Sequence, residues 1–165
     1  VDVKVNYGVD IGPGTFTADF SMSYVLEYNS QFTPGSALQD YTDLTLNKYR
    51  ADATLTYALG DHSINWHIYF IPSRCHSTTL DTNTLADATF LARCTTDSDG
   101  NTRTTGGWAH NSVQYNYNTP WDGKLTLGVN NVFDRDPVLD SNNAFDKDMY
   151  PFVGRKFLVK YTHNF

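Results

Sequence analysis

Apolar and polar residues alternate along most of this chain. The alternation is clearest in residues 15–28, where every second residue from Phe16 to Tyr28 is apolar or aromatic and the residues between are mostly Thr, Ser and Asp. Side chains of a β-strand point to opposite faces in turn, so a period of two predicts a strand with one apolar and one polar face. Further strands are predicted over residues 1–8, 44–59, 63–71, 108–118, 124–133 and 152–165. The chain is therefore predicted to be all-β, with about seven antiparallel strands.

The last predicted strand ends on an aromatic residue. Its apolar face holds Phe157, Val159, Tyr161 and Phe165, and its polar face holds Lys156, Lys160, Thr162 and Asn164. Leu158 and His163 are the two exceptions to the alternation. The strand is thus predicted to form the edge of the sheet with one apolar and one polar face.

The connections between the predicted strands alternate in length. Short connections at 9–14, 60–62 and 119–123 alternate with long ones at 29–43, 72–107 and 134–151. Successive connections of an up-and-down sheet lie at opposite ends, so all short turns should share one end and all long loops the other. This asymmetry is typical of transmembrane β-barrels, whereas a loop as long as 72–107 is uncommon in a compact soluble domain.

The two faces and the strand length favour the same interpretation. Residues 15–28 would extend about 45 Å, whereas strands of soluble domains usually have about 5–6 residues. Lys, Arg, Asp, Asn and Thr on one face suit a wet lumen, and Tyr, Phe and Trp near the strand ends of the other suit an aromatic girdle. A sheet in lipid must close, and the smallest known barrels have about eight strands. We therefore expect this chain, which starts within a predicted strand, to be the last part of a larger barrel.

Composition excludes some other classes. Aromatic residues make up 15% of the 165 residues, led by 11 Tyr and 10 Phe. The net charge of −6 gives no support for nucleic-acid binding. No apolar run approaches the ~20 residues of a membrane helix, and no signal peptide is recognised.

The two cysteines, Cys75 and Cys94, lie in the longest polar connection and outside any CxxC or Cys/His cluster. A disulfide between them would stabilise the fold by roughly 3 kcal/mol on the loop-entropy estimate and would imply an oxidising compartment. Two free thiols are the alternative.

Two stretches resemble the C-terminal part of TonB-dependent outer-membrane receptors. Residues 127–137 read LGVNNVFDRDP, which resembles the family's GxxNxFD-P hairpin. Residues 154–157 read GRKF and precede a strand ending in Phe165, as in the family's last strand. The turn TPWDGK at 119–124 is also similar, and the rhythm of strands and loops extends the likeness over residues 1–165.

The resemblance implies a barrel of about 22 strands with a plugged lumen in the bacterial outer membrane of a Gram-negative cell. It implies TonB-driven uptake of a scarce ligand such as a siderophore, an oligosaccharide or cobalamin. Its partners would be outer-membrane lipid, the remainder of the barrel and plug, and TonB. This chain would supply the last seven strands and extracellular loops. It contains neither a plug nor a TonB box, so it could not transport alone.

The resemblance also suggests site residues. Phe165 matches the terminal aromatic that signals barrel assembly, with an ordinary apolar strand residue as the alternative. Ligand contacts in such barrels come from long loops and upper lumen walls, where Tyr41, Arg74, Trp108 and His110 are candidates. Arg74 would suit an anionic siderophore and the aromatic residues would suit sugars. A packing or girdle role is the alternative for each.

No metal site, cofactor or catalytic group is predicted. Residues 97–101 read DSDGN, but an EF-hand loop begun at Asp97 would need Glu where Trp108 stands, and its glycine comes too early. Loop carboxylates are taken as hydrated, with calcium or a cationic ligand as the alternative; they are Asp134, Asp136, Asp140, Asp146 and Asp148. The histidines show no metal-binding spacing; they are His62, His67, His76, His110 and His163.

Other functions stay open at this point. A passive porin or a barrel-anchored adhesin would share the barrel but lack a plug and TonB box upstream. A soluble β-sandwich binding module would bury its apolar face and need no detergent. A barrel lipase or protease is the remaining option, but no nucleophile motif supports an enzyme.

Overall fold

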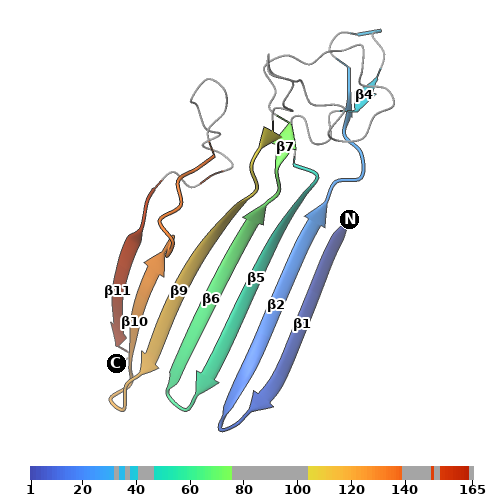
Figure 1. Ribbon diagram of the computed structural model, residues 1–165. Coiled ribbons are helices and arrows are strands. Elements are labelled where there is room, and N and C mark those ends of the chain that lie inside the picture. Colours follow the sequence, from blue (N-terminus) through green and yellow to red (C-terminus); the bar gives the residue numbers. More distant parts are fainter. Residues whose placement is uncertain are drawn as a thin grey trace.

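The computed structural model describes residues 1–31, 34–35, 38–40, 47–75, 104–138, 150 and 153–163. Seven strands form one antiparallel sheet in the order β1-β2-β5-β6-β9-β10-β11, as Figure 1 shows. They are β1 (Asp2–Ile11), β2 (Gly14–Tyr24), β5 (Tyr49–Leu59), β6 (His62–Ile71), β9 (Trp108–Asn118), β10 (Gly123–Asn130) and β11 (Lys156–His163). Two short ladders pair β3 (Asn29–Ser30) with β4 (Gln39–Asp40), and β7 (Arg74–Cys75) with β8 (Thr104–Thr105).

Each long strand pairs with its neighbour along the chain, so the sheet is up-and-down. This confirms the prediction of an all-β fold with seven antiparallel strands. Several predicted boundaries were wrong by a few residues. β1 continues to Ile11, because the turn needs only Gly12 and Pro13. β2 stops at Tyr24 rather than at residue 28, because Tyr24 pairs with Tyr49, the first residue of its partner β5.

The C-terminal hairpin is also shorter than predicted. β10 ends at Asn130 instead of residue 133, because Asn131 adopts a positive φ of 54° that an extended strand does not allow. β11 begins at Lys156 instead of residue 152. The end of β10 is thus set by a turn that alternation alone does not reveal.

The lengths of the connections segregate as predicted. The short turns β1–β2, β5–β6 and β9–β10 all lie at one end of the sheet, and the longer connections leave from the other (Figure 1). We call these the turn end and the loop end.

Strand register aligns side chains into rows that cross the whole sheet. One row consists of Tyr7, Ala18, Leu55, Trp66, Val113, Val129 and Phe157. The row beside it on the opposite face consists of Asn6, Asp19, Thr54, His67, Ser112, Asn130 and Lys156. These two rows place an apolar face and a polar face on opposite sides of the sheet, as the sequence predicts.

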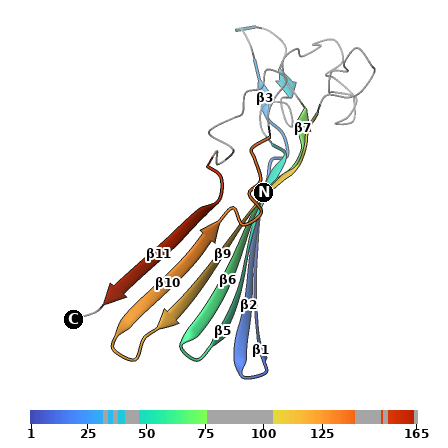
Figure 2. The same ribbon diagram turned by 60° about the vertical axis from the view of Figure 1, so that its left-hand side comes forward.

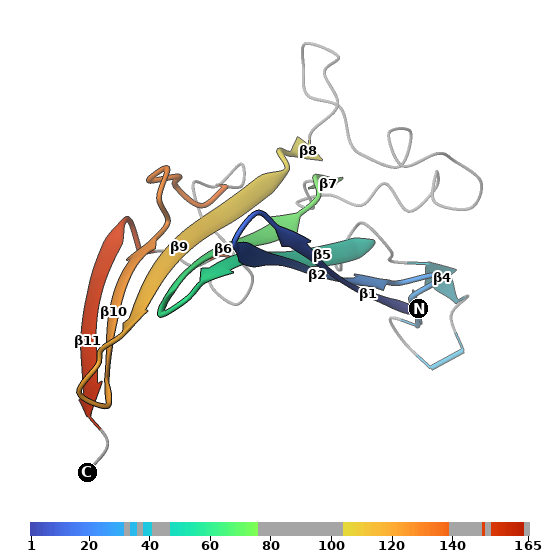
Figure 3. The same ribbon diagram turned by 90° about the horizontal axis from the view of Figure 1, so that it is seen from below.

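The sheet curves like part of a cylinder wall (Figure 3). On β6 the polar-face residues Ser63 and Asn65 are half-buried, whereas Ile64 and Trp66 on the apolar face are 47% and 41% exposed. The described elements contact only their neighbours within a sheet, so no second layer explains this difference. The crowding of small polar residues indicates that the polar face lies on the inside of the curve.

The sheet is open. Within the described part of the chain, β1 and β11 each pair on one side only and form opposite edges (Figure 2). No described segment forms a helix with the length and apolar character needed to cross a membrane.

A small apolar core lies at the loop end of the polar face. Ile71, Trp108 and Tyr150 are almost fully buried there, and Tyr69 and Val138 pack against them. The indole Nε1–H of Trp108 donates to the carbonyl of Asp136 at 3.0 Å. This cluster fixes the segment after β10 over the end of the sheet.

Gly14 is a sensitive point in the first hairpin. A Cβ added there would lie 2.5 Å from the carbonyl oxygen of Ala58 and 2.6 Å from the ring of Tyr57. Since a backbone atom cannot yield as a flexible side chain can, Gly14→Ala should destabilise the fold by about 1–3 kcal/mol. Guanidinium unfolding measures the loss.

Gly8 on the same hairpin is the matched control. A Cβ there would meet only Thr17 Cγ2, at an ordinary 3.8 Å. Gly8→Ala should therefore stay within about 0.5 kcal/mol of the unchanged chain. Equal effects of the two substitutions would contradict the close approach at Gly14.

Candidate functional site

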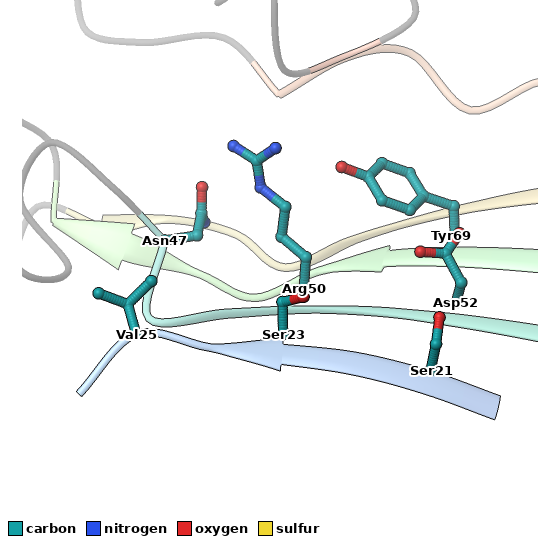
Figure 4. A pocket seen from close by; sticks show the side chains of 7 residues that line it. All are labelled: Ser21, Ser23, Val25, Asn47, Arg50, Asp52 and Tyr69. Atoms are coloured by element: carbon teal, nitrogen blue, oxygen red, sulfur yellow. The ribbon is translucent and has the colours of Figure 1, made fainter. Parts of the chain in front are cut away.

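A basin of about 450 Å³ lies on the polar face towards the loop end. It is lined by Ser21 and Ser23 of β2, Arg50 and Asp52 of β5, Tyr69 of β6, and Val25 and Asn47 just outside the strands. Figure 4 shows the side chains of Arg50 and Tyr69 rising from the sheet on the same side as the amide of Asn47. Alternation along β2, β5 and β6 directs these polar groups to one face, and the register brings them together.

Asn47 contributes an unusual acceptor to the basin. The residue is only 3% exposed, and its Nδ2 donates to the carbonyl of Pro72 at 3.1 Å. Because that carbonyl can only accept, the amide orientation is settled and Oδ1 must be the atom left over. Within the described structure this buried Oδ1 has no hydrogen-bond partner, and Figure 4 shows it pointing upward into the basin.

Arg50 supplies a cation beside this acceptor. Its side chain is exposed, and no residue that the structure describes lies within ion-pair or hydrogen-bond distance of its guanidinium. The guanidinium has five N–H donors in a fixed fork that matches a carboxylate or a phosphate. The basin thus offers donors at Arg50 and an acceptor at Asn47.

The carboxylates near the basin already have partners. Asp52 Oδ1 lies 3.2 Å from Nε2 of His67, and Asp2 Oδ1 accepts a hydrogen bond from the Ser23 hydroxyl at 2.6 Å. A neighbouring hollow of about 250 Å³ adds Lys4 and Asp19, and Asp19 accepts a hydrogen bond from the Asn6 amide. The described lining of the basin therefore combines a carboxylate that already has a partner, Asp52, with a cation that remains available, Arg50.

Trp108 and His110 were predicted from the sequence to contact a ligand. Trp108 is 1% exposed, packs edge-to-face against Tyr150 and stacks on His110. Its position is that of a packing residue, which was the alternative. His110 is half-buried on the polar face and pairs in register with Tyr69, so it lies next to the basin.

The other predicted site residues fall largely outside the described residues. Arg74 and Cys75 form β7, but their side chains are not among those described. Tyr41, Cys94, Phe165, the DSDGN stretch at 97–101 and His76 lie outside the described residues. The ligand, disulfide and assembly roles of these residues stay predictions.

The acidic set is described only at its start. Asp134 Oδ1 accepts the backbone N–H of Arg155 at 2.8 Å, and Asp136 is exposed. Asp140, Asp146 and Asp148 lie outside the described residues. In the part of the chain that can be inspected, no group of three His, Cys, Asp or Glu side chains is arranged to hold a metal ion.

Neither Asn47 nor Arg50 of this basin is predicted from the sequence as a ligand contact. Arg50 was recognised only as a member of the polar face, and Asn47 lies before the alternation of β5 begins. The burial of Asn47 can be recognised only when its partner, Pro72, is known to lie near it. The one usable signal was the Arg50–Asp52 spacing, which places a cation and a carboxylate on one face.

The LGVNNVFDRDP stretch at 127–137 has a clear structural role. Asn131 is 2% exposed, and its amide both accepts from the N–H of Arg135 at 2.9 Å and donates to the carbonyl of Arg135 at 3.0 Å. Gly128 pairs in register with Leu158 of β11, and a Cβ added there would make only ordinary contact with Leu158 Cβ, at 3.4 Å. These residues shape the junction of β10 and β11.

Compared with known proteins, the chain matches no protein-family model, no curated protein and no solved structure.

Proposed function

We propose that this chain forms part of the wall of an outer-membrane β-barrel that takes up a scarce ligand in a TonB-dependent manner. The observation that carries the proposal is the uncovered apolar face. Large side chains on it stand open to the surroundings, for example Phe157 at 76%, Val159 at 73% and Trp66 at 41% exposure. A patch of this extent is not left in water by a monomeric soluble protein, whereas lipid would cover it.

Strand length and aromatic positions fit the thickness of a membrane. β2, β5 and β9 each have 11 residues, the upper end of the ~9–11 that a tilted strand needs to cross. On β5, Tyr49 and Tyr57 share the apolar face and lie about 26 Å apart along the strand. Aromatic girdles flank an apolar band of about 25 Å in such barrels.

The turn end carries a hydrogen-bonded aromatic belt on the apolar face. The indole N–H of Trp121 donates to the Tyr161 hydroxyl at 2.9 Å, and the Tyr57 hydroxyl donates to the carbonyl of Ile11 at 3.2 Å. His62 stacks on Tyr117 with ring centroids 4.7 Å apart. Amphipathic rings of this kind suit the level of lipid headgroups.

The remaining parts of the proposal have separate support. The open edges at β1 and β11 suit a sheet that continues into further strands. The polar inner face suits a wet lumen, and the loop-end basin suits ligand capture from outside. Energised uptake through TonB is supported by the resemblance of residues 119–137 and 154–157 to TonB-dependent receptors.

Paired cysteine substitutions test which face meets lipid. Leu55 and Thr54 are adjacent on β5 and lie on opposite faces. With Cys75 and Cys94 changed to serine, Leu55→Cys and Thr54→Cys are labelled with bimane in isolated outer membranes. Lipids carrying a nitroxide should quench the label at position 55 strongly and the label at 54 weakly.

Two outcomes would overturn the membrane assignment. Quenching at neither position, in a protein that stays monodisperse without detergent, would favour a soluble β-sandwich. Stronger quenching at 54 than at 55 would mean that the faces are reversed. When the complete barrel is placed in planar bilayers, a plugged transporter should show no steady conductance, whereas an open conductance would favour a passive porin.

A further inference from the structure

We propose that the basin binds a hydroxylated carboxylate of monosaccharide size, such as a sugar acid. Its carboxylate would pair with the guanidinium of Arg50, and one of its hydroxyls would donate to Oδ1 of Asn47. The inference rests on the proposed function only in taking the polar face to be open to water.

The requirement for a donor comes from Asn47. A buried carbonyl oxygen without a partner is energetically costly, so any group that donates to it gains binding free energy. Pro72 holds the amide in place through the 3.1 Å hydrogen bond to Nδ2, so Oδ1 cannot turn to another partner. A ligand hydroxyl or N–H meets this need, but a carboxylate or phosphate oxygen does not.

The requirement for a carboxylate comes from Arg50. Its guanidinium is exposed, unpaired with any described residue and directed to the same side of the sheet as Asn47 Oδ1 (Figure 4). Planar carboxylates form two parallel hydrogen bonds with this group. A neutral sugar would satisfy Asn47 but leave the cation without its best partner.

The remaining groups limit the charge of the ligand. Asp52 also lines the basin, 3.2 Å from Nε2 of His67, and its carboxylate would repel a ligand with several negative charges. The Tyr69 hydroxyl and Ser21 can exchange hydrogen bonds with further hydroxyls. One carboxylate among several hydroxyls fits this set better than a phosphate or a polycarboxylate does.

Calorimetric titration of the purified full chain tests the ligand class. The probe is D-galacturonate, with D-galactose as the analogue without a carboxylate and cyclohexanecarboxylate as the analogue without hydroxyls. Saturable binding of galacturonate should be about tenfold or more tighter than binding of either analogue, since each lacks one of the two polar anchors. The role of Asn47 is tested with ligand analogues and not by substitution, because a substitution would also remove its hydrogen bond to Pro72.

Variants of Arg50 test the other anchor. Arg50→Gln should weaken galacturonate binding about tenfold and leave galactose unchanged, while Arg50→Lys should fall between because it keeps the charge but loses the fork. Lys160→Gln removes the same charge from the polar face of β11, far from the basin, and should bind as the unchanged chain does. Equal weakening by Arg50→Gln and Lys160→Gln would reduce the role of Arg50 to general electrostatics.

Failure of this inference can be told apart from failure of the barrel proposal. Absence of saturable galacturonate binding, or equal binding of cyclohexanecarboxylate, would overturn the ligand class even where bimane quenching supports a lipid-facing apolar side. Binding with the expected selectivity in a protein that needs no detergent would retain the site and discard the membrane. The two measurements use different residues, so neither result determines the other.

Discussion

Replacing Leu55 with arginine is expected to lower the free energy of unfolding in lipid vesicles by about 2–4 kcal/mol. Leu55 lies near the middle of β5 and on the apolar face, in the row that contains Trp66 and Phe157. In the proposed barrel its side chain meets the hydrocarbon centre, where a guanidinium loses its hydration and finds no partner. Guanidinium unfolding followed by tryptophan fluorescence measures the loss.

Two further arginine substitutions separate the effects of depth and of face. Leu59 ends the same strand on the same face at the turn end, so Leu59→Arg should cost only about 0–1 kcal/mol because the charge can reach the headgroups. Thr54→Arg places the charge at the same depth as Leu55 but on the polar face, and should change stability little. A larger loss for Thr54→Arg than for Leu55→Arg would refute the proposed orientation.

The fold could be predicted largely because the apolar and polar residues of each strand alternate according to the face on which they lie. Every residue of the row from Tyr7 to Phe157 is apolar, and every residue of the row beside it is polar, so the alternation within single strands already specified both faces. The loop asymmetry followed from the same strand positions. Boundaries were less accurate, because residues such as Asn131 end a strand through a positive φ that depends on side-chain hydrogen bonds.

The candidate site was harder to predict because it depends on contacts between distant segments. Asn47 becomes notable only beside Pro72, which is 25 residues away in the chain. Trp108 has an aromatic side chain of the kind expected to contact a ligand, yet the segment after β10 covers it. Both outcomes depend on how connections fold over the loop end, and alternation within strands carries no information on that.

The Trp108→Ala variant is expected to release the segment after β10 from the sheet. Trp108 is 1% exposed and forms a small core with Ile71 and Tyr150, so its removal should cost about 3–5 kcal/mol of local stability. The hydrogen bond from its indole to Asp136 would also be lost. Hydrogen exchange should become faster at the amides of Val132 and Asp134, which now donate to Asn111 and Asn131.

Trp108→Phe provides the matched control for this loss. It keeps most of the buried apolar volume but cannot donate to Asp136. The loss of local stability should therefore be on the order of 1 kcal/mol, and exchange should rise by far less than in Trp108→Ala. The amides at the turn end, such as Asn118, should keep their protection in both variants because the core lies at the other end of the sheet.

Unchanged exchange at Val132 and Asp134 in Trp108→Ala, together with weaker galacturonate binding, would instead make Trp108 a ligand contact. The packing around Ile71 and Tyr150 favours the structural role, because a side chain enclosed on both its edge and its face leaves little surface for a ligand.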